Sequence, residues 1–176
     1  AVYIFSLNNG TWVEEGRISA SDGAEGDKFG WALSVFNETG VVGAPYNDSN
    51  GTEAGAAYVF VRDTAAEWSE ESKLVSSDGA LSDNFGWSVG VGDDLAIVGA
   101  LYSDAPSSDS GSVYTYERTG TNWIEQSKLT GTESASGDRF GTSVSMSDGL
   151  AVVGSPGYMV ASKETGAIHV FTAELR

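Results

Sequence analysis

Aspartates recur at fixed places along this sequence. Asp27, Asp83 and Asp138 each stand two residues before a phenylalanine, and Asp22 and Asp78 stand five residues before the first two of them. Carboxylate oxygens from loops are ligands that Ca²⁺ prefers. Aspartate in a tight turn also accepts hydrogen bonds from nearby backbone N–H groups, which is its commonest use there. Both roles, calcium ligand and turn cap, are open for these five residues.

Two further acids, Asp48 and Asp104, stand in later loops of the same pattern. The run Asp48-Ser49-Asn50-Gly51 is similar to the first half of an EF-hand-type loop, but a bidentate acid at the right distance does not follow it. We therefore place Asp48 and Asp104 behind the first five as candidate ligands. Ca²⁺ is the one cofactor that these side chains suggest.

Catalytic chemistry has little support in this sequence. It has no cysteine and a single histidine, His169, so neither a Ser-His-Asp nor a Cys-His arrangement can be drawn within it. Pairs of carboxylates are plentiful, but spacing alone does not select one pair for acid–base work. We predict that the chain is not an enzyme.

The elements that carry these residues repeat. Phe29, Phe85 and Phe140 are separated by 56 and 55 positions, and the same intervals separate Trp12, Trp68 and Trp123. A third series keeps the register, and its members are Tyr3, Tyr58, Tyr114 and His169. Such self-similarity marks a tandem array. We divide the 176 residues, as one domain, into units of approximately 1–55, 56–111 and 112–166, with a partial fourth unit at 167–176.

Each unit contains four short strand-like runs separated by Gly, Asp, Ser, Asn and Pro, and no helical periodicity. A period near 55 residues with four strands predicts an all-β fold made of β-propeller blades, about three in this chain. A solenoid of sheets is the alternative. We expect the Phe-Gly strand innermost, then a Val-rich strand, a Tyr strand and an outer Trp-led strand, whose charged residues suit an edge. The tryptophans are interpreted as packing residues of the blades.

The recurring phrases are Phe29-Gly30 with Gly43-Ala44-Pro45, Phe85-Gly86 with Gly99-Ala100, and Phe140-Gly141 with Gly154-Ser155-Pro156. They resemble FG-GAP repeats, the blades of the integrin α-chain propeller and of many secreted and surface proteins, over essentially the whole chain. Leu101 stands in place of the proline in the second copy, and Ser155 in place of the alanine in the third. The calcium loop of integrin-like blades, which follows the Phe-Gly strand, is too short here to be carried over.

The resemblance implies a non-catalytic extracellular binding or structural module, acting in adhesion or protein–protein assembly at a cell surface. The alternative is an ancillary or glycan-binding propeller domain of a larger secreted enzyme. In blades of this kind two sets of loops share one face, which bears the ligand in integrin-like propellers. Twelve acids fall in those loops: Asp22, Glu25, Asp27, Asp48, Glu53, Asp78, Asp83, Asp104, Asp109, Glu133, Asp138 and Glu164.

Three blades are fewer than the four to eight that close a propeller. We therefore expect a partial propeller, or a segment of a larger one, whose open apolar faces are covered by a protein partner or by further blades of the same polypeptide or another chain. The net charge of −16 disfavours nucleic acid as a partner and favours cations or basic proteins. No run of apolar residues is long enough to insert into a membrane.

Four asparagines lie in N-glycosylation acceptor triplets within expected turns, namely Asn9, Asn37, Asn47 and Asn50. Asn-rich turns also produce such triplets by chance. With the resemblance, they indicate a glycoprotein that is extracellular or displayed at the cell surface.

Overall fold

The computed structural model describes residues 1–104, 106–147 and 149–172, and within them it contains strands but no helix. No described segment therefore forms a helix that could cross a membrane. The strands are β1 (Val2–Asn8), β2 (Thr11–Ile18), β3 (Leu33–Phe36), β4 (Thr39–Ala44), β5 (Ala56–Arg62), β6 (Trp68–Leu74), β7 (Phe85–Val91), β8 (Leu95–Ala100), β9 (Ser112–Thr119), β10 (Asn122–Leu129), β11 (Ser143–Ser147), β12 (Leu150–Ser155), β13 (Met159–Val160), β14 (Lys163–Glu164) and β15 (Ala167–Thr172).

Two sheets are complete and have four antiparallel strands each, in the orders β3-β4-β5-β6 and β7-β8-β9-β10. Within each complete sheet every strand pairs with its neighbour in sequence, and connections of two to eleven residues join them. The Phe-Gly run begins each sheet and the Trp-led run ends it. This is the predicted all-β, four-stranded blade with the predicted strand order.

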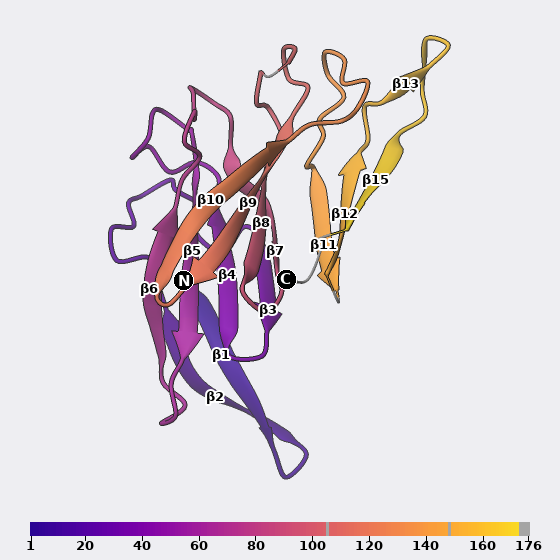
Figure 1. Ribbon diagram of the computed structural model, residues 1–176. Coiled ribbons are helices and arrows are strands. Elements are labelled where there is room, and N and C mark those ends of the chain that lie inside the picture. The colour runs from indigo at the N-terminus through magenta and orange to yellow at the C-terminus, as the bar shows by residue number, and fades with distance from the viewer. Residues whose placement is uncertain (105, 148, 173–176) are drawn as a thin grey trace.

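The sheets at the two ends are partial. The first consists of β1 and β2 alone, which hold the third and fourth strand positions, and the last consists of β11, β12 and β15, which hold the first three. The small β13–β14 hairpin lies beyond the upper end of this last sheet (Figure 1). The units as predicted begin at a Tyr strand, whereas each sheet after the first begins at the strand of the Phe-Gly run. Each of the three full units therefore supplies strands to two successive sheets.

The sheets lie side by side in chain order (Figure 1), and clusters of buried apolar side chains lie between them. Between the two complete sheets, Val41 and Val59 of the earlier sheet are packed in one cluster with Phe85, Tyr114 and Tyr116 of the later one. Fully burying one such aromatic side chain contributes roughly 1.5–3 kcal/mol. Face-to-face packing of this kind is therefore the main source of the fold's stability.

The sheets approach one another most closely at the glycines of the Phe-Gly and Gly-Ala phrases. A Cβ placed on Gly43 would overlap the carbonyl oxygen of Gly86 on the next sheet, and a Cβ on Gly99 would overlap that of Gly141. The recurring glycines are thus required by backbone-to-backbone contact between sheets.

Candidate binding face

The two sets of loops predicted to share a face do so. The backbone N–H of Tyr46 donates to the carbonyl of Asp27 at 3.3 Å, and Tyr102 donates to Asp83 at the same distance. Neighbouring repeats are joined as well, because the N–H of Ser82 donates to the carbonyl of Thr52 at 3.0 Å. We call this surface the loop face; it comprises residues 19–31, 45–55, 75–87, 101–104, 106–111, 130–142 and 156–166.

Asp22 forms a clamp between its loop and the sheet that follows it. Its carboxylate accepts hydrogen bonds from the Tyr58 hydroxyl at 2.7 Å and from Lys73 Nζ at 2.6 Å, and Nζ also lies 5.3 Å from the centre of the Tyr58 ring. The hydrogen bonds from Lys73 and then Tyr58 hold the pKa of Asp22 below its ordinary value. Burial, followed by the Asp22 carboxylate, raises the pKa of the Tyr58 hydroxyl.

The next repeat builds the same clamp from Asp78, Tyr114 and Lys128. The two hydrogen bonds to Asp78 are both 2.7 Å long, and Lys128 Nζ lies 5.2 Å from the Tyr114 ring centre. Burial acts to raise the pKa of Asp78, but the hydrogen bonds from Lys128 and Tyr114 outweigh it and leave the pKa lowered. Both carboxylates are therefore engaged by a cation that belongs to the chain itself.

The recurring aspartates two residues before phenylalanine are buried and cap their own turns. Asp27 accepts a hydrogen bond from the N–H of Ala24 at 3.0 Å, and Asp83 and Asp138 do the same with the N–H three residues earlier, at 3.0 and 2.8 Å. Burial is the main cause that raises the pKa of Asp83. These contacts are those of the turn-cap role.

The two secondary candidate ligands, Asp48 and Asp104, accept hydrogen bonds from backbone N–H groups of their own loops. Asp48 Oδ1 accepts from the N–H of Glu53 at 2.8 Å, and Asp104 Oδ1 accepts from that of Asp109 at 2.9 Å. Among the described residues, three or more His, Cys, Asp or Glu side chains nowhere gather into a group that could hold a metal ion. Calcium binding by the seven aspartates stays a prediction.

The third repeat departs from the clamp. His169 takes the tyrosine position and Glu133 the acid position, and Glu133 accepts a hydrogen bond from the Tyr158 hydroxyl at 3.1 Å. His169 lies in β15 with its ring centre 5.0 Å from that of Phe140. Its Nε2 and the Oδ1 of Asp138 are buried without a hydrogen-bond partner.

The four predicted glycosylation sites are not equally accessible. Asn9, Asn37 and Asn50 are exposed. Asn47 is buried, and its Nδ2 donates to Asp27 at 2.8 Å and to the Tyr58 hydroxyl at 3.3 Å. A glycan on Asn47 would require these contacts to break, so in the folded chain we restrict the prediction to the other three.

An aromatic hollow on the loop face was not singled out in the sequence. Trp31 is 47% exposed and meets Tyr46 edge to face, with ring centres 6.0 Å apart. Together with three acids, Glu25, Asp48 and Glu53, and one base, Lys28, these rings line an open hollow of about 400 Å³. The ring centre of Trp87 lies 4.7 Å from that of Trp31, and Trp87 continues the aromatic row towards Tyr102. The signal was a Trp directly after Phe-Gly, with a Tyr shortly after Gly-Ala, in two successive repeats.

The geometry defines a class of protein. Four-stranded antiparallel sheets, repeated along the chain, packed face to face and carrying their loops on one face, are blades of the β-propeller type. The FG-GAP repeat model matches residues 12–60, 68–116 and 123–171, which together make up most of the chain, so this protein belongs to the FG-GAP repeat family. A search of curated proteins gave no match.

Proposed function

We propose that this chain is a non-catalytic binding module of an extracellular FG-GAP propeller, and that its loop face docks a basic segment of a protein partner in adhesion or assembly at a cell surface. The observation that carries the proposal is the open hollow in which Trp31 and Tyr46 stand among Glu25, Asp48 and Glu53. An aromatic face next to carboxylates favours a Lys or Arg side chain through cation–π and ionic attraction together.

The chain provides its own example of such a contact. In the following repeat the guanidinium of Arg139 lies 5.8 Å from the centre of the Tyr102 ring. The position that corresponds to Arg139 next to Tyr46 is taken by Asn84, whose amide donates to the carbonyls of Pro45 and Glu53 at 3.1 and 3.0 Å. From the following repeat Tyr46 thus has a neutral neighbour where Tyr102 has a cation. Lys28 also lines the hollow, but the three carboxylates there outnumber it, so the hollow can receive a further cation from outside.

The net charge of −16 supports the same direction of binding. A surface rich in carboxylates attracts a basic partner over long range and repels nucleic acid and anionic lipid. Ca²⁺ would compete for the same carboxylates.

The test measures binding of a peptide of alternating Lys, Arg and Gly with blocked termini. Titration calorimetry at low ionic strength gives its affinity. Trp31→Ala should weaken binding about three- to thirty-fold, which is the range of a cation–π contact. Trp12→Ala removes a tryptophan that is also exposed but lies on β2, and should leave the affinity unchanged. Equal losses in the two variants, or no binding at low ionic strength, would refute the proposal.

The contribution of carboxylate charge to peptide binding is tested in the same titration with Glu53→Gln. Glu117→Gln, on β9, is the matched control. Calcium chloride that displaces the peptide better than sodium chloride at matched ionic strength would show that the loop face also holds calcium. Equal displacement would show screening alone.

The second candidate, a glycan-binding propeller of a larger secreted enzyme, is favoured by the same two rings, since a sugar ring also stacks on Trp and its hydroxyls can donate to carboxylates. Neutral oligosaccharides in the same titration separate the two. Binding that is abolished by Trp31→Ala but independent of salt would favour the glycan.

A further inference from the structure

The aromatic row on the loop face extends beyond the first hollow onto the next repeat. The ring centre of Trp31 lies 6.0 Å from that of Tyr46 and 4.7 Å from that of Trp87, and the Trp87 and Tyr102 ring centres are 6.4 Å apart. Four rings from two successive repeats therefore form one continuous series of contacts, which is long enough for several residues of a ligand.

The two ends of the row differ in the side chains beside the rings. Glu25 lines the hollow at the first end. The corresponding residue at the second end is Leu81, whose side chain is 70% exposed. The guanidinium of Arg139 already lies 5.8 Å from the centre of the Tyr102 ring, and it would repel a second cation there. The first end therefore favours a cationic side chain of a ligand, and the second end favours an apolar one.

Charge follows the same division. The lining of the first hollow contains three acids and one base. At the second end the loop positions that correspond to Asp48 and Glu53 hold two acids, Asp104 and Asp109, while Arg139 provides the base. The second end thus has one acid fewer for the same number of bases, so its attraction for a cation is weaker.

The loops around the row use their own backbone N–H groups. The N–H of Glu53 donates to Asp48 Oδ1 at 2.8 Å, and that of Ala54 donates to the carbonyl of Gly51 at 3.0 Å. The N–H of Asn84 donates to the carbonyl of Glu53 at 3.1 Å. A ligand that adds a strand depends on free main-chain groups. A polyproline II segment makes no such bonds, because its backbone is solvated and its side chains make the contacts.

The spacing of the row also suits a polyproline II segment. Such a helix has three residues per turn, so residues three apart face the same way and lie about 9 Å apart. Packed sheets lie about 10 Å apart, and Trp31 directly precedes β3 of one sheet while Trp87 belongs to β7 of the next. Proline-rich segments in this conformation dock on surfaces lined by aromatic rings.

We propose that the loop face binds a polyproline II segment of its protein partner. An Arg or Lys of this segment enters the first hollow, and a proline three residues away lies against Trp87 and Leu81. This inference rests on the function proposed above and names the class of sequence to which the basic segment belongs.

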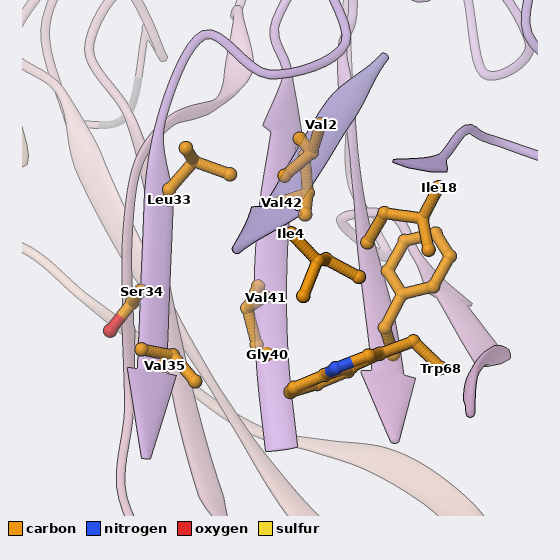
Figure 2. Close-up of a pocket in the computed structure, with 11 residues that line it drawn as sticks. Val2, Ile4, Ile18, Leu33, Ser34, Val35, Gly40, Val41, Val42 and Trp68 are labelled. Carbon is orange, nitrogen blue, oxygen red and sulfur yellow. The ribbon is translucent and has the colours of Figure 1, made fainter. Parts of the chain in front are cut away.

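An apolar groove elsewhere on the chain lacks this combination of rings and charge. It measures about 230 Å³, and Figure 2 shows Val2, Ile4 and Leu33 among the side chains around it. Its described lining contains no charged side chain, so the arginine of a ligand would lose water there without gaining a partner. The basic segment is therefore expected on the loop face.

The test compares two peptides of equal charge with blocked termini, by titration calorimetry at low ionic strength. One has an arginine joined to six prolines, and the other has an arginine joined to six alternating Gly and Ser residues. In at least one orientation, with the arginine first or last, the proline peptide should bind at least about tenfold more tightly, because it is already in the bound conformation.

The register of the peptide is tested in the same series. Glycine in place of the third proline, counted from the arginine, should weaken binding at least about threefold more than glycine in place of the second. Both changes loosen the helix, whereas only the third residue faces Trp87. Equal losses at the two positions would contradict the proposed register.

Leu81→Ser tests the second end of the row. Because Leu81 lies in an exposed loop, the variant should keep its thermal unfolding temperature while its affinity for the proline peptide falls about three- to tenfold. Its affinity for the Gly-Ser peptide should not change. Leu33→Ser, at an exposed leucine of the apolar groove, is the matched control and should leave both affinities unchanged.

Equal affinities for the proline and Gly-Ser peptides, or an unchanged affinity in Leu81→Ser, would overturn this inference. The proposed function would still stand if the peptide of Lys, Arg and Gly binds, and it would fall as well if that peptide does not. A loss of affinity in Leu33→Ser without one in Leu81→Ser would show that the peptide binds in the apolar groove, which also contradicts the proposal.

Discussion

The complete sheets and the partial sheets of this protein have similar residue types at corresponding strand positions, but these residues differ in burial. Tyr58 and Phe60 on β5 are buried, whereas their counterparts Tyr3 and Phe5 on β1 are half exposed. The residue types match and the registers match. Burial along this chain is thus decided by whether a neighbouring sheet is present, and the same aromatic side chain is a core residue in one repeat and an open surface in another.

The largest expected effect tests this contrast in the core. Phe85→Ala removes a fully buried ring that packs against Tyr114 and Tyr116, with ring centres 5.5 and 6.0 Å apart, and should lower the free energy of unfolding by about 3–5 kcal/mol. Trp12→Ala, at a side chain of β2 that is 67% exposed, should change it by about 0.5 kcal/mol or less. Urea unfolding measures the free energy of unfolding of both variants. Similar losses in the two would contradict the difference in burial between complete and partial sheets.

The next effect concerns the contact between glycines. Gly99→Ala forces a Cβ into the carbonyl of Gly141 on the following sheet and should cost about 1–3 kcal/mol, as overpacking does. Gly16→Ala, on β2, has no atom within 4 Å of the new Cβ and serves as the matched control. Thermal unfolding should separate the two variants by several degrees. A Gly16→Ala variant as unstable as Gly99→Ala would mean that the strand propensity of the residue, and not the contact, sets the cost.

The smallest effect is a difference in pH dependence between two aspartates. Asp22 has a lowered pKa in the folded chain, so its stabilisation is complete above its unfolded value of about 3.8 and is lost as the pH falls through the folded value. Asp83 has a raised pKa, so its ionisation opposes folding above the folded value, and this opposition disappears as the pH falls through the folded value towards 3.8.

Asp22→Asn should therefore cost about 1 kcal/mol at pH 7 and less at about pH 3, in the range of a half-exposed ion pair. Asp83→Asn keeps an oxygen that can cap Ala80 and should cost less than Asp22→Asn at pH 7. Urea unfolding of both variants at the two pH values provides the measurement. A larger cost for Asp83→Asn at pH 7 would contradict the assigned shifts.

Much of the fold could be predicted because its signals are local. The intervals between Phe29, Phe85 and Phe140 and the polar turns between apolar runs define the four strands and their order. The family follows from the same phrases. What the local pattern could not give is contact across distance: Lys73 reaches Asp22 across 51 residues, and no spacing rule announces that pairing.

The site was harder to predict for the same reason. Asp27 and Asp48 look alike as loop acids, but one is buried and the other exposed. Asn47 fits a glycosylation triplet yet its amide is enclosed by Asp27 and Tyr58. Trp31 lies on the inner strand run, where packing was expected, but 47% of it is exposed and it lines the hollow with Tyr46.

The positions of the clamp residues along the chain determine when, during translation, the clamp contacts can form. Asp22 and Asp78 lie on the linkers that enter the complete sheets, whereas Lys73 and Lys128 lie on the last strands of those sheets, 51 and 50 residues later. A nascent chain leaving the ribosome therefore exposes the acid long before its lysine emerges. Each blade can be fastened only when its fourth strand has left the exit tunnel, by which time its first three strands can already have paired. The hydrogen bonds of each clamp can therefore form only after the whole of its blade has been translated.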